Sequence, residues 1–224
     1  MALRIVLLGA PGVGKGTQAR ELARQFQVPH ISTGDIFRQH VEQGSPLGER
    51  VRLSMDNGTL VPDDLTCQVV VERLEMGDCN EGYILDGFPR SMPQAHFLNE
   101  YLAGHGDTLN LAISIEVPDE ELIERLCARR FCPTCGAIYN MKFDPPAQDE
   151  RCDRDDCGAP LAQRSDDTEE TVRERLRIYH ESTESIRDYY RDHNKLHVIR
   201  GSGLMPEVVQ ARIGEAIAAT QAVS

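Results

Sequence analysis

Short apolar runs alternate along this chain with longer segments in which apolar residues recur at helical spacing. The apolar runs have the length of buried strands and are rich in Leu, Ile and Val. They predict strands at Leu3 to Leu8, Val28 to Ile31, Tyr83 to Asp86, Leu109 to Val117 and Lys195 to Arg200. Because a helix-length segment separates each strand from the next, the pattern indicates a parallel sheet with helical crossovers.

Helix-start signals open the intervening segments. A cap-like Ser, Thr or Asp satisfies a free N–H group of the first turn, and a proline there removes one. These signals predict helices after Gly16, Thr33, Pro62, Pro118 and Asp167, and a last helix near Pro206. The predicted fold class is α/β, with a five-stranded parallel sheet flanked by helices.

The first apolar run leads into a glycine-rich loop, where residues 9–17 read Gly-Ala-Pro-Gly-Val-Gly-Lys-Gly-Thr. Such glycines let successive backbone N–H groups face an anion, and the following helix points its partially positive N-terminus at the same spot. The general phosphate-loop pattern places Ser or Thr directly after the lysine, whereas here a glycine intervenes, which indicates a particular subclass. The residues expected to hold nucleotide phosphates are Gly12, Val13, Gly14, Lys15, Gly16 and Thr17.

A second cluster of candidate residues follows the third predicted strand. Asp86 ends that strand, and Arg90 comes four residues later, after Gly87, Phe88 and Pro89. Parallel sheets bind ligands at the carboxyl ends of their strands. Asp86 can therefore hold the waters of a Mg²⁺ ion bound beside the phosphate loop, and Arg90 can bind a phosphate with two N–H groups.

Composition narrows the classes of function. The chain has 224 residues and a formal net charge of −12, which argues against a broad nucleic-acid-binding face. It contains no apolar stretch long enough for a membrane span or a signal peptide, so we expect a cytoplasmic protein. In that reducing compartment, the seven cysteines are interpreted first as candidate metal ligands.

Residues 131–163 depart from the strand–helix alternation. This segment contains four cysteines and four prolines but few large apolar residues, so it reads as a small inserted lobe without a core of its own. Two residues separate Cys132 from Cys135, and four separate Cys152 from Cys157. Two such pairs are typical of a tetrahedral, structural Zn²⁺ site. Cys67, Cys79 and Cys127 lack close partners in the sequence and are expected to be small buried hydrophobic residues.

Several motifs in order make the chain resemble the adenylate kinase family in its long-lid bacterial form. They are the phosphate loop, the run Ile31-Ser-Thr-Gly-Asp35 with Arg38, the run Leu60-Val-Pro-Asp63, the stretch Leu85 to Arg90 with Gln94, and Arg164-Ser-Asp-Asp167 followed by Glu170-Thr-Val172 and Arg175. The resemblance covers essentially the whole chain. It implies a core of residues 1–31, 62–127 and 168–224, an AMP-binding lobe at 32–61 and a lid at 128–167.

The resemblance also bears on the fourth metal ligand. Related lids usually have two residues between the third and fourth ligands, which would put Asp155 in the fourth position. Cys157 is favoured because it keeps the family's distance to Arg164, so residues 154–156 contain a local insertion. The expected zinc ligands are Cys132, Cys135, Cys152 and Cys157, with Asp155 as the alternative.

The activity implied by the resemblance is phosphoryl transfer from Mg-ATP to AMP, giving two ADP. The attacking phosphate oxygen is already anionic, so catalysis depends on positioning and charge neutralisation, helped by a lid that excludes water. The catalytic group expected from the family's motifs is Lys15, Asp86, Arg90, Arg125, Arg129, Arg164 and Arg175, with Asp166 and Asp167 orienting the arginines. The expected ATP site adds Ile138, Tyr139 and Gly203 to the phosphate loop and Arg129. The expected AMP site is Thr33, Arg38, Thr59, Leu60, Val61, Gly87, Phe88, Pro89, Arg90, Gln94, Arg164 and Arg175.

Alternatives remain open at this stage. Arg125 and Arg129 lie four apart on a predicted helix that also carries Glu121 and Glu124, so each arginine could simply form a surface salt bridge. Gln94 favours AMP as the acceptor, because relatives that prefer UMP or CMP tend to carry Asn there. Another nucleoside-monophosphate kinase, a phosphate-loop GTPase and a zinc ribbon for nucleic acid are the competing interpretations. The acidic lobe and the absence of an Asn-Lys-x-Asp motif argue against the last two. A monomer is the family expectation.

Overall fold

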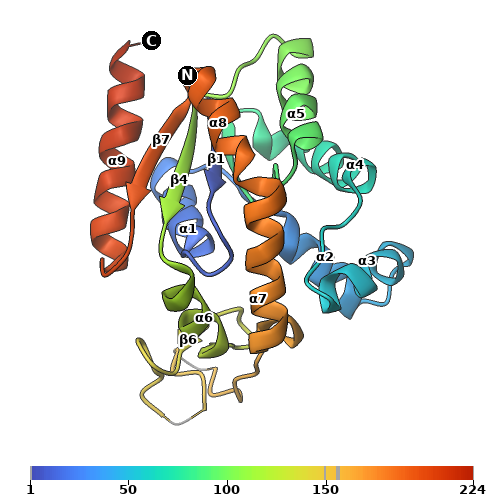
Figure 1. The fold of residues 1–224 in the computed structure, drawn as a ribbon, viewed down its shortest axis with the longest axis vertical. Helices are drawn as coiled ribbons and strands as arrows, with labels where there is room; N and C mark the ends of the chain where they lie inside the picture. Colours follow the sequence, from blue (N-terminus) through green and yellow to red (C-terminus); the bar gives the residue numbers. More distant parts are fainter. Residues whose placement is uncertain (1, 149, 155–156, 224) are drawn as a thin grey trace.

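The computed structural model describes residues 2–148, 150–154 and 157–223. Its central sheet has five parallel strands in the order β2-β3-β1-β4-β7. These strands are β1 (Leu3–Leu8), β2 (His30–Ser32), β3 (Gly82–Asp86), β4 (Leu111–Glu116) and β7 (Leu196–Arg200). The α/β class and all five predicted strands are confirmed, and Figure 1 shows helices on both faces of the sheet.

The strand boundaries differ slightly from the predictions. The second strand begins at His30 rather than Val28, because Gln27 closes α1 in the left-handed conformation and Val28 N–H still bonds Ala23 in that helix. The fourth strand begins at Leu111 rather than Leu109.

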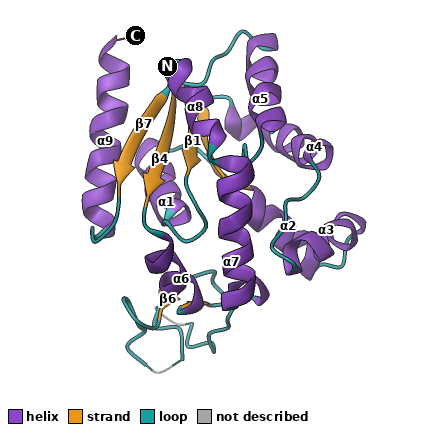
Figure 2. Ribbon diagram, viewed as in Figure 1, coloured by secondary structure: helices purple, strands orange, loops and turns teal. Residues whose placement is uncertain are grey.

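The described part of the chain contains nine α-helices (Figure 2). They are α1 (Lys15–Phe26), α2 (Thr33–Glu42), α3 (Pro46–Asp56), α4 (Asp63–Leu74), α5 (Met92–Gly104), α6 (Asp119–Cys127), α7 (Glu169–Ile178), α8 (Ser185–Asp192) and α9 (Pro206–Val223). A π-helix (Tyr179–Thr183) joins α7 to α8, and short 3₁₀ turns lie at Gly77–Cys79 and Ser165–Asp167. Helices α3, α5 and α8 were not predicted, although Ser45 and Ser91 cap α3 and α5, and Pro46 and Pro93 lie in the first turns of these helices.

The two faces of the sheet bury separate hydrophobic clusters. Alternate residues of β1 face opposite ways: Ile5 and Leu7 join one cluster, whereas Val6 and Leu8 join the other. The first cluster packs under α1, α6, α7 and α9, and the second under α4, α5 and α8. Covering on both faces explains why β1, β3 and β4 are mostly apolar.

Two smaller units project from this core. Helices α2 and α3 have their own cluster around Phe37, Val51 and Val61, and they lie on the right of Figure 1. Residues 128–167, at the bottom of Figure 1, contain the antiparallel strands β5 (Arg129–Phe131) and β6 (Ile138–Asn140). The small cluster in this segment includes Cys132, Tyr139 and Cys152. No helix in the described residues is both long and apolar enough to cross a membrane.

Candidate functional site

The phosphate loop connects β1 to α1 through backbone geometry that glycine permits. Gly9, Gly12 and Gly14 have φ values of 137°, 87° and 96°. A Cβ on Gly9 would lie 2.5 Å from the carbonyl oxygen of Ile115, so this strand end has no room for a side chain. The loop therefore brings its backbone to the N-terminus of α1, as phosphate binding requires.

Lys15 is the first residue of α1, and its side chain folds back so that the ammonium group contacts the backbone of the loop. Its Nζ donates to the carbonyl oxygens of Gly9 at 2.7 Å and Ala10 at 3.0 Å. Burial, and then repulsion from Arg90 and Arg175, lower the pKa of Lys15 to about 8, while attraction to Asp86 opposes them. An anion bound beside Lys15 would therefore stabilise the charged form of its ammonium group.

Asp86, at the end of β3, lies between the phosphate loop and His30 of β2. Its Oδ2 is 3.3 Å from His30 Nε2, and a Cβ on Gly16 would lie 3.4 Å from the same oxygen. Burial alone would raise the pKa of Asp86, but the His30 hydrogen bond and the charge of Lys15 keep it below its usual value. An ionised carboxylate beside the phosphate loop fits a hard cation such as Mg²⁺. His30 was not predicted from the sequence; it is the first residue of β2 and belongs to no motif.

A second pocket lies between the α2–α3 unit and the carboxyl edge of the sheet. It encloses about 530 Å³ of empty space, part of which is open to solvent. The structure brings together at this pocket nine of the twelve residues predicted for AMP: Thr33, Arg38, Thr59, Leu60, Val61, Gly87, Arg90, Gln94 and Arg175. Phe88, Pro89 and Arg164 are not among its lining residues.

Gln94 is buried and holds two neighbours of the pocket in place. Its Oε1 accepts the backbone N–H of Arg90 at 2.7 Å, and its Nε2 donates to Asp63 Oδ1 at 2.6 Å. A primary amide offers two donors and two acceptor sites, so one of each remains for a ligand. Asp63 was named above in a family motif but was given no role in the site; it also accepts a hydrogen bond from Ser91 Oγ at 2.8 Å.

Four arginines, Arg90, Arg129, Arg164 and Arg175, converge at and beside the pocket, and the last three have acidic partners. Arg129 forms a two-bond ion pair with the fully buried Asp167, at 2.5 and 2.8 Å. Arg175 pairs with Asp166 at 2.9 Å and with Asp167 at 3.3 Å. Burial and nearby positive charges lower the pKa values of Arg90 and Arg164 to about 10. A cluster of desolvated cations is suited to neutralising several phosphate charges.

The structure separates Arg125 from Arg129. The expectation that both lie on one helix is wrong, because α6 ends at Cys127 and Arg129 begins β5. Arg125 forms an ion pair with Glu121, the partner that the surface alternative predicted. Glu121 also accepts a hydrogen bond from Ser202 Oγ at 2.7 Å, which places the loop containing Gly203 beside Arg125.

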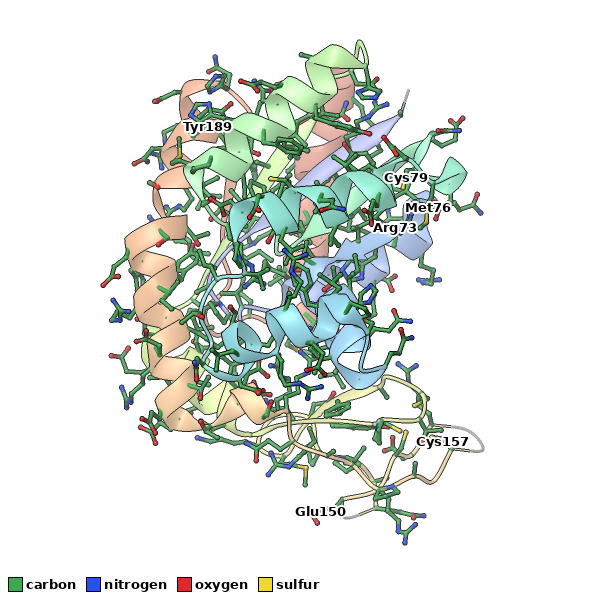
Figure 3. All side chains as sticks on the ribbon, turned by 90° about the vertical axis from the view of Figure 1, so that its right-hand side faces the viewer. Arg73, Met76, Cys79, Glu150, Cys157 and Tyr189 are labelled. Carbon is green, nitrogen blue, oxygen red and sulfur yellow. The ribbon has the colours of Figure 1, made fainter. Side chains whose placement is uncertain are left out.

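The predicted metal ligands come together in the lid. The Sγ atoms of Cys132, Cys135, Cys152 and Cys157 all lie within 4.8 Å of one another. A tetrahedron with Zn–S bonds of about 2.3 Å has S···S edges of about 3.8 Å, so the four sulfurs fit a structural zinc ion. The alternative ligand Asp155 lies outside the described residues. Figure 3 shows Cys157 in this lobe, at the opposite end of the molecule from Tyr189.

The other predicted residues are the three isolated cysteines and, from the predicted ATP site, Tyr139 and Ile138. Cys67 and Cys79 are buried as expected, whereas Cys127 is half-buried. Tyr139, predicted for the ATP site, directs its hydroxyl within the lid: it donates to Asp153 Oδ1 at 2.6 Å and lies 3.3 Å from Cys152 Sγ. Ile138 is half-buried in the adjacent position of β6.

Gly58 contacts α7 where the α2–α3 unit approaches the arginine cluster, and this contact gives a testable prediction. Its φ is +70°, and a Cβ there would lie 2.7 Å from Arg175 Cγ. We expect Gly58→Ala to raise the KM for AMP by about tenfold, since strain and a clash together cost roughly 1–3 kcal/mol. Steady-state kinetics with varied AMP measure this effect.

Gly44→Ala is the matched control for Gly58. Gly44 lies in the same lobe with φ +61°, but a Cβ there would meet no described heavy atom within 4 Å. An equal rise in KM for both variants would mean that backbone strain alone, and not contact with Arg175, explains the effect.

A phosphate loop joined to an arginine-lined pocket at one sheet edge defines a phosphate-loop phosphotransferase with a separate acceptor site. Comparisons with known proteins agree with this class. A profile of the family described as adenylate kinase matches residues 7–195. An adenylate kinase of Clostridium perfringens is 47% identical over 211 residues, which are 94% of this chain and 96% of that protein. One of Moorella thermoacetica is 48% identical over 215 residues, or 96% of this chain and 98% of the relative. The chain belongs to the adenylate kinase family.

Proposed function

We propose that this protein transfers the γ-phosphoryl group of Mg-ATP reversibly to AMP, giving two ADP, and so balances the adenine nucleotides. One observation carries the proposal: Asp86, which lies beside the phosphate loop, ends β3, and Gly87 and Arg90, which follow it directly in the chain, line the acceptor pocket. Donor and acceptor phosphates bound at these two places would meet between them. Membership of the family supports the same reaction.

The reaction needs no general base, because the acceptor oxygen is already an anion near neutral pH. In the proposed mechanism, Lys15 and the loop glycines bind the phosphates of ATP, while Arg38 and Arg90 bind the phosphate of AMP. The remaining arginines neutralise the transferred group, and they are Arg125, Arg129, Arg164 and Arg175. Asp166 and Asp167 hold two of these arginines in place by the ion pairs described above.

Mg²⁺ would be held through water molecules near Asp86 and Thr17, where it would neutralise phosphate charge. Asp86 is itself held by His30 through Oδ2, the oxygen that also lies on the side of the phosphate loop, near Gly16. Zn²⁺ in the lid would be structural, since the four cysteines lie in a lobe with few large buried side chains.

We propose three structural parts: a core of residues 1–31, 62–127 and 168–224, an AMP-binding lobe at 32–61 and a lid at 128–167. Contacts between lobe and lid support closure around both nucleotides. Ser165 Oγ donates to Asp56 Oδ1 at 3.4 Å, and Arg164 lies 3.8 Å from Asp35. Closure would expel water and so suppress wasteful hydrolysis of ATP. We further propose a monomer acting in the cytoplasm on nucleotides alone, without nucleic-acid or membrane partners.

An acceptor panel tests the proposed function. We expect turnover with Mg-ATP and AMP to exceed turnover with UMP, CMP or GMP by about a hundredfold, since the unused donor and acceptor of Gln94 match the edge of adenine. A coupled assay of ADP formation measures it, with an acceptor-free reaction as the control. Preference for a pyrimidine acceptor would contradict the assignment of the base but leave the phosphate chemistry intact.

The lowered pKa of Lys15 predicts how nucleotide binding depends on pH. In the free protein, this lysine loses its charge as the pH rises through about 8, whereas bound phosphates favour the charged form. Binding of Mg-ATP above that pH must therefore take up a proton, and its Kd should rise by up to about tenfold per pH unit. Calorimetry in two buffers of different ionisation enthalpy measures both effects. An unchanged Kd up to about pH 9.5, without proton uptake, would contradict the prediction.

A further inference from the structure

The main chain of Arg90 is held by two side chains from different parts of the fold. Its N–H donates to Gln94 Oε1 at 2.7 Å, within the first turn of α5. Its carbonyl oxygen accepts a hydrogen bond from Thr183 Oγ1 at 2.8 Å, although Thr183 lies 93 residues further along the chain. The second bond therefore ties the loop after β3 to the segment between α7 and α8.

Thr183 ends the π-helix that joins these two helices. Glu184 N–H bonds the carbonyl of Tyr179, five residues earlier, at 3.0 Å. π-Turns are rare and occur mostly at functional sites. A helical threonine commonly bonds a carbonyl in its own preceding turn, but the Thr183 hydroxyl reaches a distant one, and its side chain is only 8% exposed. Figure 3 labels Tyr189 on α8, the helix that continues from this turn.

The hydrogen bond from Thr183 holds Arg90 at a place where the positive charge of Arg175 repels it. Arg175 lies on α7, eight residues before Thr183, and its charge contributes after burial to the lowered pKa of Arg90. Two neighbouring guanidinium groups repel each other until an anion binds between them. A restraint on the Arg90 main chain from the turn that directly follows α7, the helix that carries Arg175, limits the spacing of the two cations. Arg90 is also held from within its own loop, where Nε donates to the carbonyl of Gly87 at 2.8 Å.

We propose that Thr183 is a positioning residue for the phosphate acceptor. Its hydroxyl holds the Arg90 main chain relative to Arg175, so that both guanidinium groups face the acceptor phosphate before it binds. Thr183 acts through Arg90, and the inference rests on the proposed function. Preorganisation of this kind lowers the cost of ordering the site when the ligand enters.

Thr183→Val tests the proposal because it removes the hydroxyl and nearly preserves the shape of the side chain. We expect the KM for AMP to rise about five- to thirtyfold, the effect of losing one buried hydrogen bond, while the KM for ATP stays within about twofold. Thr183→Ser keeps the hydroxyl and should restore the KM for AMP. Thr220→Val is the control: its hydroxyl bonds Ala216 within α9 at 3.0 Å, and the substitution should leave both KM values unchanged.

The results with these variants distinguish a failure of this inference from a failure of the proposed function. If Thr183→Val leaves the KM for AMP unchanged, or raises both KM values equally, Thr183 has no specific positioning role. If Thr183→Val does not fold, Thr183→Ser and Thr183→Ala are compared by the same criterion, and equal KM values for AMP overturn the inference. A wild-type protein without AMP-dependent turnover would instead refute the proposed function.

Discussion

Lys15→Ala is expected to lower kcat/KM for Mg-ATP by at least about 10²- to 10³-fold, the cost of losing one preorganised group that stabilises charge in a transition state. Lys15 is the only full positive charge that the phosphate loop itself carries. Its ammonium group is buried and rests on the carbonyl oxygens of Gly9 and Ala10, so it can reach a phosphate within the loop without a large movement. Steady-state turnover with saturating AMP measures the loss.

Lys195→Ala is the control for the loss of one positive charge. Lys195 directly precedes β7, so it lies at the amino edge of the parallel sheet, opposite the carboxyl edge that carries the site. This variant should retain turnover within about twofold, because screening weakens the effect of a distant charge. A comparable loss in both variants would mean that net charge, rather than contact with the phosphates, explains the result. A fully active Lys15→Ala would remove the phosphate loop from the mechanism.

The parts of the site that could be predicted from the sequence are those encoded within a few residues. The phosphate loop follows a buried strand directly, and three of its four glycines, Gly9, Gly12 and Gly14, adopt the positive φ values that glycine permits. The four cysteines could be predicted because metal ligands leave a spacing pattern that is independent of the rest of the fold. Helices α3, α5 and α8 were missed, although a capping serine with a proline one or two residues later was a usable signal for the first two.

Contacts between distant segments could not be predicted in the same way. His30 meets Asp86 across 56 residues, and Thr183 meets Arg90 across 93. Neither pair has a repeat, spacing or composition that marks it, because the contact is made by neighbouring strands or by packed helices. Arg125 and Arg129 show the same limit, since their spacing of four suggested one helix face, whereas the end of α6 sends them to different partners.

Removing the metal ligand Cys132 should destabilise the protein while sparing its chemistry. Binding of a structural zinc ion contributes directly to the folding free energy of a lobe that lacks a sufficient core. We expect Cys132→Ser to lower the Tm by roughly 5–15 °C, which corresponds to a few kcal/mol for a chain of this size. Turnover well below the transition should stay within about threefold, because the four sulfurs bind no substrate in the proposed mechanism. Calorimetry and metal analysis of the same samples measure both effects.

Two further variants identify the fourth ligand. The Cys157 Sγ lies 3.5 Å from Cys132 Sγ within the four-sulfur cluster, so Cys157→Ser should also lose zinc and lower the Tm. Asp155→Asn should retain one zinc ion per chain, and Cys127→Ser, which removes a thiol outside the cluster, should behave like the wild type. The reverse result for Asp155 and Cys157 would assign the carboxylate as the ligand. A large loss of turnover at unchanged Tm in Cys132→Ser would show that the lid metal acts in catalysis, because a purely structural ion affects activity only through folding.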